Sequence, residues 1–139
     1  MSPLISSGFS INIFDLIAIM KEFICLLAGW LVPGLGHLLQ KKVWRGVTFF
    51  VSIYALTAMG LAMGGKIYPL QAENPLTLLA FFADLGNFLV FGLSRYLAFG
   101  QGALERATFE FGTAYIAGAG LLNYLVALDA FDIAKGKKK

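Results

Sequence analysis

The chain contains four apolar stretches long enough to cross a lipid bilayer, and short polar segments separate them. The stretches cover residues 23–39, 46–65, 76–98 and 111–133. A transmembrane helix needs about 17–25 mostly apolar residues, because the hydrocarbon core of a bilayer is about 30 Å thick. Connections this short join helices that are antiparallel neighbours. We therefore predict an all-α integral membrane bundle of about four transmembrane helices, forming a single domain over residues 1–139.

The composition agrees with this fold class. Apolar residues make up 58% of the 139 residues and charged residues only 14%, against roughly 45–50% and 25% in soluble domains. A soluble globular enzyme and a disordered chain are both excluded. The net charge of +3 comes from basic residues gathered at a few points, so we expect no nucleic-acid partner. The single cysteine, Cys25, excludes an intramolecular disulfide.

Before the first stretch, residues 11–20 are apolar apart from Asn12 and Asp15, and this segment is too short to span a bilayer. Asp15 and Glu22 are seven residues apart and therefore share one helical face. This pattern predicts a short interfacial helix over about residues 10–22, which leads into the first span. The alternative is one continuous first helix that begins near Phe14.

The basic residues do not settle the orientation of four spans. If every stretch crosses, five basic residues lie on one side of the membrane and six on the other, whereas the positive-inside rule needs an asymmetry. The basic loop at 41–45 and the basic tail at 134–139 are three spans apart. They fall on opposite sides unless one segment is re-entrant. We favour the tail inside, in the inner membrane of a bacterium.

The most distinctive run is Pro33-Gly34-Leu35-Gly36-His37. Proline removes a backbone donor and glycine adds backbone freedom, so we predict a structural turn at Pro33, Gly34, Gly36 and His37. Backbone groups freed inside a membrane need partners within the protein, and His37 is the nearest side chain that supplies one. The alternative is an axial ligand to haem or chlorophyll through His37. We expect no metal site, because no second soft ligand lies near His37 in the sequence.

The same region resembles a known family. Trp30 to His37, followed by Lys41-Lys42 and Arg45-Gly46, resembles the first helix, turn and second helix of small bacterial membrane proteins related to the TM2 domain. Those proteins carry a Pro-Gly-x-Gly-His/Gln run, then a basic turn and a glycine. Residues 119–133 resemble a four-helix family of unknown function with a similar first half. Leu38-Leu39 replace the aromatic pair common in TM2 domains. The resemblance implies a helical membrane fold and no established activity.

Three polar residues interrupt the last two stretches. Asp84 and Asn87 share a helical face because they are three residues apart, and Asn123 lies near the centre of the fourth stretch. A charge at mid-bilayer costs about 2.5–3.5 kcal/mol on insertion scales, so Asp84 should face the bundle, be protonated or meet a partner chain. We predict interhelical hydrogen bonds for Asp84, Asn87 and Asn123. The alternative is an ion or proton pathway.

Small residues recur at a spacing of four. Gly60 with Gly64, and Ala114 with Gly118, each form a pair that permits close approach of helix backbones. We predict that both pairs serve helix packing. The alternatives are docking onto another subunit and room for a bulky lipid or pigment.

No catalytic arrangement is recognisable, because the sequence has one histidine and one cysteine and no phosphate-binding glycine loop. We therefore predict a non-catalytic structural or accessory subunit of a larger membrane complex, respiratory or photosynthetic, with bound lipid and no required cofactor. Its partners would be membrane lipids and other membrane subunits. The alternatives are a small oligomeric transporter or channel, and a subunit that binds chlorophyll or haem through His37.

Overall fold

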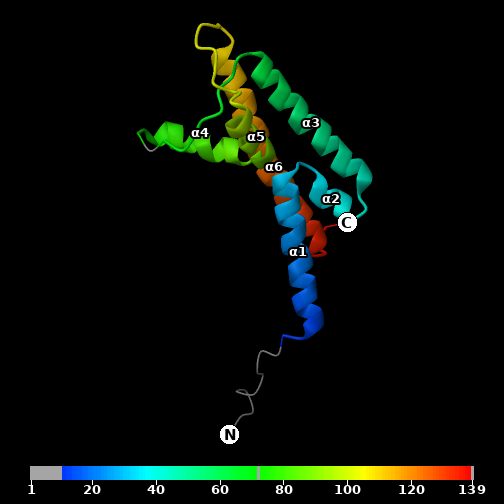
Figure 1. Cartoon of the computed structure of the whole chain (residues 1–139). Helices are drawn as coiled ribbons and strands as arrows, with labels where there is room; N and C mark the ends of the chain where they lie inside the picture. The colour runs from blue at the N-terminus through cyan, green and yellow to red at the C-terminus, as the bar shows by residue number, and fades with distance from the viewer. Residues whose placement is uncertain (1–10, 72, 139) are drawn as a thin grey trace.

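The computed structural model describes residues 11–71 and 73–138, which form helices, connecting turns and one isolated bridge. Residues 10 and 139, the ends of the predicted interfacial helix and basic tail, lie outside the described residues. The prediction of an all-α fold is confirmed for this part of the chain. Figure 1 shows two long helices side by side. Two shorter helices lie toward one end of them, and the first helix projects beyond the other end. The helices are α1 (Ile13–Leu31), α2 (Leu35–Leu39), α3 (Val43–Ala62), α4 (Pro75–Leu85), α5 (Phe88–Leu97) and α6 (Phe109–Ala134).

The antiparallel helices α3 and α6 are the centre of the bundle, and each is long and apolar enough to cross a membrane. Ile53 of α3 packs against Ala119 and Val126 of α6. The helices have 20 and 26 residues, which gives lengths of about 30 and 39 Å. These lengths match the hydrocarbon core of a bilayer. The protein is therefore a membrane protein, and the stretches at 46–65 and 111–133 correspond to α3 and α6.

The N-terminal segment is one continuous helix, so our division into an interfacial helix at 10–22 and a span at 23–39 is wrong. The first helix, α1, runs unbroken across this boundary. The physical reason is that Lys21 and Glu22 interrupt the apolar pattern without interrupting the helix, since both are good helix formers. The alternative of one long first helix describes the structure.

The chain breaks after α1 at the proline and glycines noted in the sequence. Gly34 has φ +81°, a left-handed conformation that glycine adopts without strain, and a Cβ there would collide with the carbonyl of Gly46. The short helix α2 then runs back beside α1, so that a Cβ on Gly36 would collide with the carbonyl of Cys25. The predicted span at 23–39 is therefore the end of one helix followed by a short return.

The predicted span at 76–98 is a bent pair of helices, because α4 and α5 are bent by 106° across a short break. The chain before the pair meets the chain after it: Lys66 and Gln101 form an antiparallel bridge, and the N–H of Ile67 donates to the carbonyl of Gly100 at 2.9 Å. Both ends of the pair therefore lie together at one end of α3 and α6. The described residues contain two helices of spanning length, or three if the bent pair is one span, so four spans are not confirmed.

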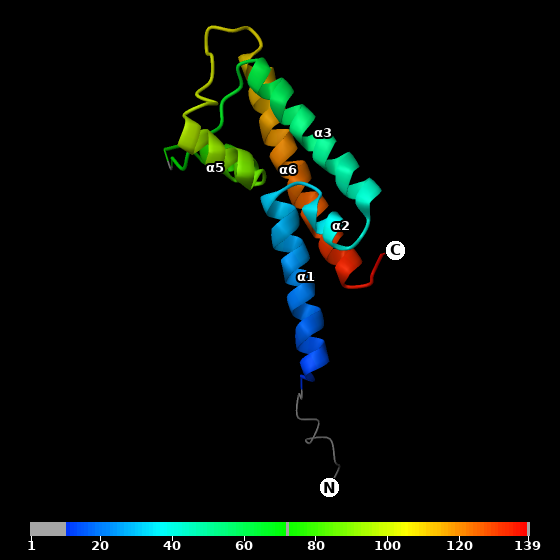
Figure 2. The same ribbon diagram turned by 45° about the vertical axis from the view of Figure 1, so that its right-hand side comes forward.

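The loop before α3 and the tail after α6 lie at the same end of the molecule. The Gln40 side chain donates to the carbonyl of Ala130 at 2.7 Å, and Lys138 Nζ lies 2.8 Å from Asp129 Oδ1. Figure 2 shows the C-terminus close to α2 and the start of α3. Four crossing spans would have placed this loop and tail at opposite ends. They meet because α3 and α6 are antiparallel and both ends of the α4–α5 pair lie at the other end of these two helices.

The predicted small-residue pairs behave differently from one another. Gly60 packs closely against α6, but a Cβ at Gly64 would meet the side chain of Ala103 in the following loop. The prediction that Gly60 and Gly64 share a helix face is wrong, because α3 ends before Gly64, whose φ is +81°. On α6, Ala114 is exposed and no described atom lies within 4 Å of a Cβ placed on Gly118. The Ala114–Gly118 pair therefore does not pack within the described chain.

The closest approach in the bundle is between α6 and the break between α4 and α5. A Cβ on Gly120 would collide with the carbonyl of Ala83, and a Cβ on Gly86 would collide with the carbonyl of Gly120. Both contacts are with backbone, which cannot move aside as a side chain end can. Glycine is therefore required on both surfaces.

Two alanine substitutions on α6 test this packing. We expect Gly120→Ala to lower the free energy of unfolding by about 1–3 kcal/mol, the usual cost of overpacking. Gly118→Ala, two residues away in open space, should be neutral or stabilise by about 0.5–1 kcal/mol, because alanine favours the helix. The measurement is thermal unfolding of the purified protein in detergent. Equal melting temperatures for the two variants would contradict the contact.

Candidate functional site

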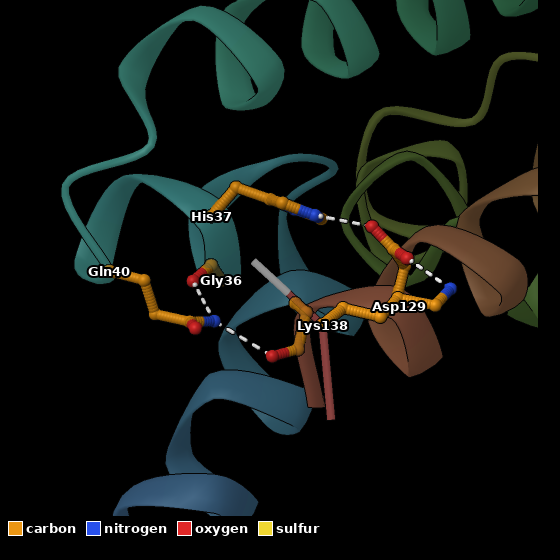
Figure 3. A network of polar contacts seen from close by, with 6 residues as sticks. Gly36, His37, Gln40, Asp129 and Lys138 are labelled. Carbon is orange, nitrogen blue, oxygen red and sulfur yellow. Dashed lines mark hydrogen bonds and ion pairs between the residues drawn. The ribbon is translucent and has the colours of Figure 1, made fainter. Parts of the chain in front are cut away.

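The first polar cluster joins α2, α6 and the tail. His37 is fully buried on α2, and its Nε2 lies 3.0 Å from Asp129 Oδ2 on α6. The other carboxylate oxygen of Asp129 accepts from Lys138 at 2.8 Å, and this contact raises the pKa of the Lys138 ammonium above its ordinary value. Figure 3 shows the three side chains in line, with Asp129 in the middle. Because an ionised carboxylate only accepts, His37 carries its proton on Nε2.

Gln40 adds a second link between the same two helices. Its Nε2 donates to the carbonyls of Gly36, at 3.0 Å, and Ala130, at 2.7 Å, as the dashed lines in Figure 3 show. Helix ends leave backbone carbonyls without intrahelical partners, and a membrane setting makes that costly. Gln40 therefore satisfies carbonyls of both α2 and α6 with one side chain.

The surroundings of His37 suit a fixed hydrogen bond. Its ring lies against Phe49, with 5.1 Å between ring centroids. An axial ligand to haem or chlorophyll needs an accessible ring nitrogen, but Nε2 faces Asp129. The cluster can hold α2 against α6.

Sequence reasoning singled out His37 and did not find its partners. Asp129 is 92 residues away and Gln40 bonds across 90 residues to Ala130. The available signal was weak: Asp129 interrupts the last apolar stretch near its end, and Gln40 begins the first polar connection. Neither position shows by itself which segment it will meet.

The second cluster surrounds the break between α4 and α5. The N–H of Tyr68 donates to Asp84 Oδ2 at 2.8 Å. Asn87 Nδ2 donates to Thr57 Oγ1 on α3 at 3.0 Å. Asp84, Asn87 and Thr57 are all buried. The two polar residues of the third stretch therefore bind different neighbours, the incoming loop and α3.

Asn123 of α6 completes this cluster from the other side. Its Nδ2 donates to the carbonyl of Gly86 at 2.8 Å and to the carbonyl of Trp30 at 2.9 Å. One amide group therefore links α6 to the α4–α5 break and to the end of α1. The structure brings Asp84, Asn87 and Asn123 to one place, although they come from two different apolar stretches.

Each residue of this trio keeps one buried oxygen without a protein partner in the described part of the chain: Oδ1 of Asp84, of Asn87 and of Asn123. No lysine or arginine in the described ranges pairs with Asp84. Over residues 11–71 and 73–138, no group of three or more His, Cys, Asp or Glu side chains is placed to hold a metal ion. The two clusters thus consist mainly of bonds that connect helices.

The His37–Asp129 bond yields a direct test. We expect His37→Leu to lower the free energy of unfolding by about 1–3 kcal/mol, since Asp129 loses a buried donor. His37→Gln should be close to wild type, because the amide also donates. Unfolding in detergent measures both. In a double-mutant cycle with Asp129→Leu, the two leucine substitutions should cost less together than their sum. Strict additivity would show that the pair is not coupled.

Comparison with known proteins adds one relationship. No curated protein and no solved structure matches the chain. The model of a family of unknown function, DUF6677, matches residues 24–139. This match covers α6, α3 and both polar clusters. The chain therefore belongs to the DUF6677 family.

Proposed function

We propose that this protein is a non-catalytic subunit of a larger membrane complex, in the cytoplasmic membrane of a bacterium, and that it assembles through the first half of α1. The observation that carries the proposal is the exposure of this helix. Of the 19 residues of α1, only Cys25 and Gly29 are buried. The resemblance to small bacterial membrane proteins supports the choice of membrane.

The first half of α1 extends past the rest of the bundle. The ring of Phe23 packs against Phe131, with centroids 5.9 Å apart, and Phe131 lies in the last turn of α6. Because α6 continues only three residues past Phe131, residues 13–22 of the antiparallel α1 extend beyond the end of α6 by about 10 Å, at 1.5 Å per residue. Figures 1 and 2 both show this part of α1 standing free of the other helices. The family match begins at residue 24, so the projecting segment lies outside it.

The projecting segment is apolar on most of its circumference. Phe14 is 80% exposed, and Ile13, Leu16, Ile17, Ile19 and Met20 are also exposed. It lies past the level of the lysines at the end of α6, where a bilayer gives way to water. Apart from Asp15, Lys21 and Glu22, this surface is apolar, and an apolar helix surface in water favours burial. A neighbouring subunit with an apolar groove would provide it.

The uses of the polar side chains support a structural role. Asn123, Gln40 and Tyr124 all donate to backbone carbonyls of neighbouring helices. His37 and Asp129 bind each other. These groups are committed to joining helices, which is the work of a scaffold in a membrane, where interhelical hydrogen bonds and close packing supply the stability.

The assembly proposal is tested on native membranes. In mild detergent, the wild-type protein should migrate with a much larger complex. Phe14→Lys combined with Ile17→Lys should release it, because two charges enter an apolar contact. Leu104→Lys is the matched control: Leu104 is also 80% exposed but lies in the loop at the far end, so this variant should stay assembled. Migration of the wild-type protein as a lone 15.1 kDa chain would overturn the proposal.

A second candidate function, proton or cation transport, is favoured by one observation. Asp84 is a buried carboxyl at a helix break, with one oxygen unpartnered among the described residues. Broken helices form the ion sites of many transporters, and carboxyl groups inside a membrane mark ion and proton pathways. The subunit proposal instead treats Asp84 as a helix-joining group.

Substitutions at Asp84 separate these two functions. If Asp84 is structural, Asp84→Asn should be tolerated, since the amide oxygen still accepts from the Tyr68 N–H. Asp84→Leu should lower the free energy of unfolding by about 1–3 kcal/mol, the cost of an unsatisfied buried donor. Unfolding in detergent gives the stability, and pH-sensitive dye in reconstituted vesicles gives the flux. Proton flux that Asp84→Asn abolishes would favour the transporter.

A further inference from the structure

We infer that one end of the molecule is a binding surface for anionic phospholipid headgroups and therefore faces the cytoplasm. We call it the basic end, and it is formed by the loop before α3 and the tail after α6. Its basic residues are Lys41, Lys42, Arg45, Lys135, Lys137 and Lys138. The inference concerns the lipid partner and the orientation of the chain, and it does not depend on a partner subunit.

The fold holds the two basic segments together. Gln40, next to Lys41, is bonded to the carbonyl of Ala130 near the end of α6. Lys138 reaches back to Asp129, whose other oxygen binds His37 on α2. Arg45 lies near enough to Lys138 for their positive charges to oppose each other. Two segments 90 residues apart in the sequence thus make one surface.

The basic end has an excess of positive charge. Six described basic residues face two carboxylates, those of Asp129 and Asp132, and Asp129 is already bound to Lys138 and His37. The segment between α3 and α6, with the first turn of α6, is balanced by comparison. It carries three basic residues and three glutamates besides the buried Asp84. One of its cations, Arg106, donates to the carbonyl of Ala62.

Apolar side chains among the lysines mark the boundary of a bilayer. Trp44 is 85% exposed between Lys42 and Arg45, and Val43 and Leu39 beside it are exposed as well. Tryptophan gathers at membrane interfaces, at the level of the headgroups. Lysine and arginine reach from such positions to headgroup phosphates. The basic end therefore combines phosphate-binding charges with an interfacial anchor.

A groove beside the basic end suits the acyl chain of the same lipid. It has a volume of about 450 Å³ and is lined by apolar residues such as Phe49, Leu122 and Leu125, and by the polar side chains of Asp129, Asp132 and Lys138. A chain lying in this groove would place its phosphate near Lys138, the basic residue in the lining. The occupant we assign is an anionic phospholipid of the surrounding bilayer.

Orientation follows from the same surface. Anionic lipids and the positive-inside rule both direct lysine-rich segments to the cytoplasmic side. Because α3 and α6 are the two crossing helices, the loop before α3 and the tail after α6 would both be cytoplasmic. The loops around Lys66 and Glu105 would then lie on the outer side.

Lipid binding is measured with the purified protein in neutral detergent, using quenching of Trp44 fluorescence by brominated phosphatidylglycerol. A Trp30→Phe background leaves Trp44 as the reporter. Brominated phosphatidylglycerol should bind more tightly than brominated phosphatidylcholine. Lys135→Gln with Lys137→Gln should weaken its binding about fivefold per charge removed. The control variant, Lys66→Gln with Arg95→Gln, lies at the other end and should bind brominated phosphatidylglycerol as tightly as the wild-type protein. Equal quenching by the two lipids, or equal effects of the two variants, would overturn the inference.

Orientation is measured independently by cysteine labelling. In a Cys25→Ala background, single cysteines at Lys42, Lys137 and Glu105 are treated in whole cells with a membrane-impermeant maleimide. Lys42→Cys and Lys137→Cys should react only after the cells are permeabilised, and Glu105→Cys should react before. Labelling of the first two from outside, or from opposite sides, would overturn the assignment. Neither experiment requires a partner protein, so their failure is distinct from failure of the subunit proposal.

Discussion

The bundle depends on the close contact of α6 with the break between α4 and α5. Gly120 lets the backbones meet, and Asn123, one turn later, donates to the carbonyl of Gly86 in the break and to that of Trp30 at the end of α1. Lipid offers no hydrophobic force to press helices together, so contact distance and interhelical hydrogen bonds decide which helices associate. One turn of α6 thereby fixes two other parts of the chain.

Local features of the sequence predicted much of this arrangement. The apolar stretches at 46–65 and 111–133 identified the two long helices, because hydropathy over twenty residues is a property of the segment alone. Pro33 and Gly34 marked a real break, since the backbone limits of these residues act wherever they occur. Asn123 was singled out as an interhelical residue because a buried amide in an apolar helix requires partners. The all-helical fold and the membrane setting follow from such features.

Features that depend on distant pairing could not be predicted in the same way. Hydropathy cannot tell a stretch that crosses from one that returns, and the return of residues 76–98 rests on the pairing of Lys66 with Gln101. The partner of His37 is 92 residues away, and no local pattern points to it. The division at residue 22 failed for a different reason: Lys21 and Glu22 interrupt the apolar pattern, but both residues favour the helix. The TM2 resemblance stays a prediction.

The return of the α4–α5 pair also changes the membrane orientation that the basic residues indicate. With four crossings, the lysines of the loop and of the tail would oppose each other across the membrane, and the charge bias would cancel. When the pair returns, both groups of lysines lie on the same side of the membrane. The difference in basic residues between the two sides then indicates an orientation. The same end contains the bonds from Asp129 to His37 and Lys138, which tie the tail to α2 beside the start of α3. The contacts that close the bundle at this end therefore also gather the charge that would orient it. A change that loosened the tail from Asp129 would weaken packing and charge bias together, because one set of residues supplies both.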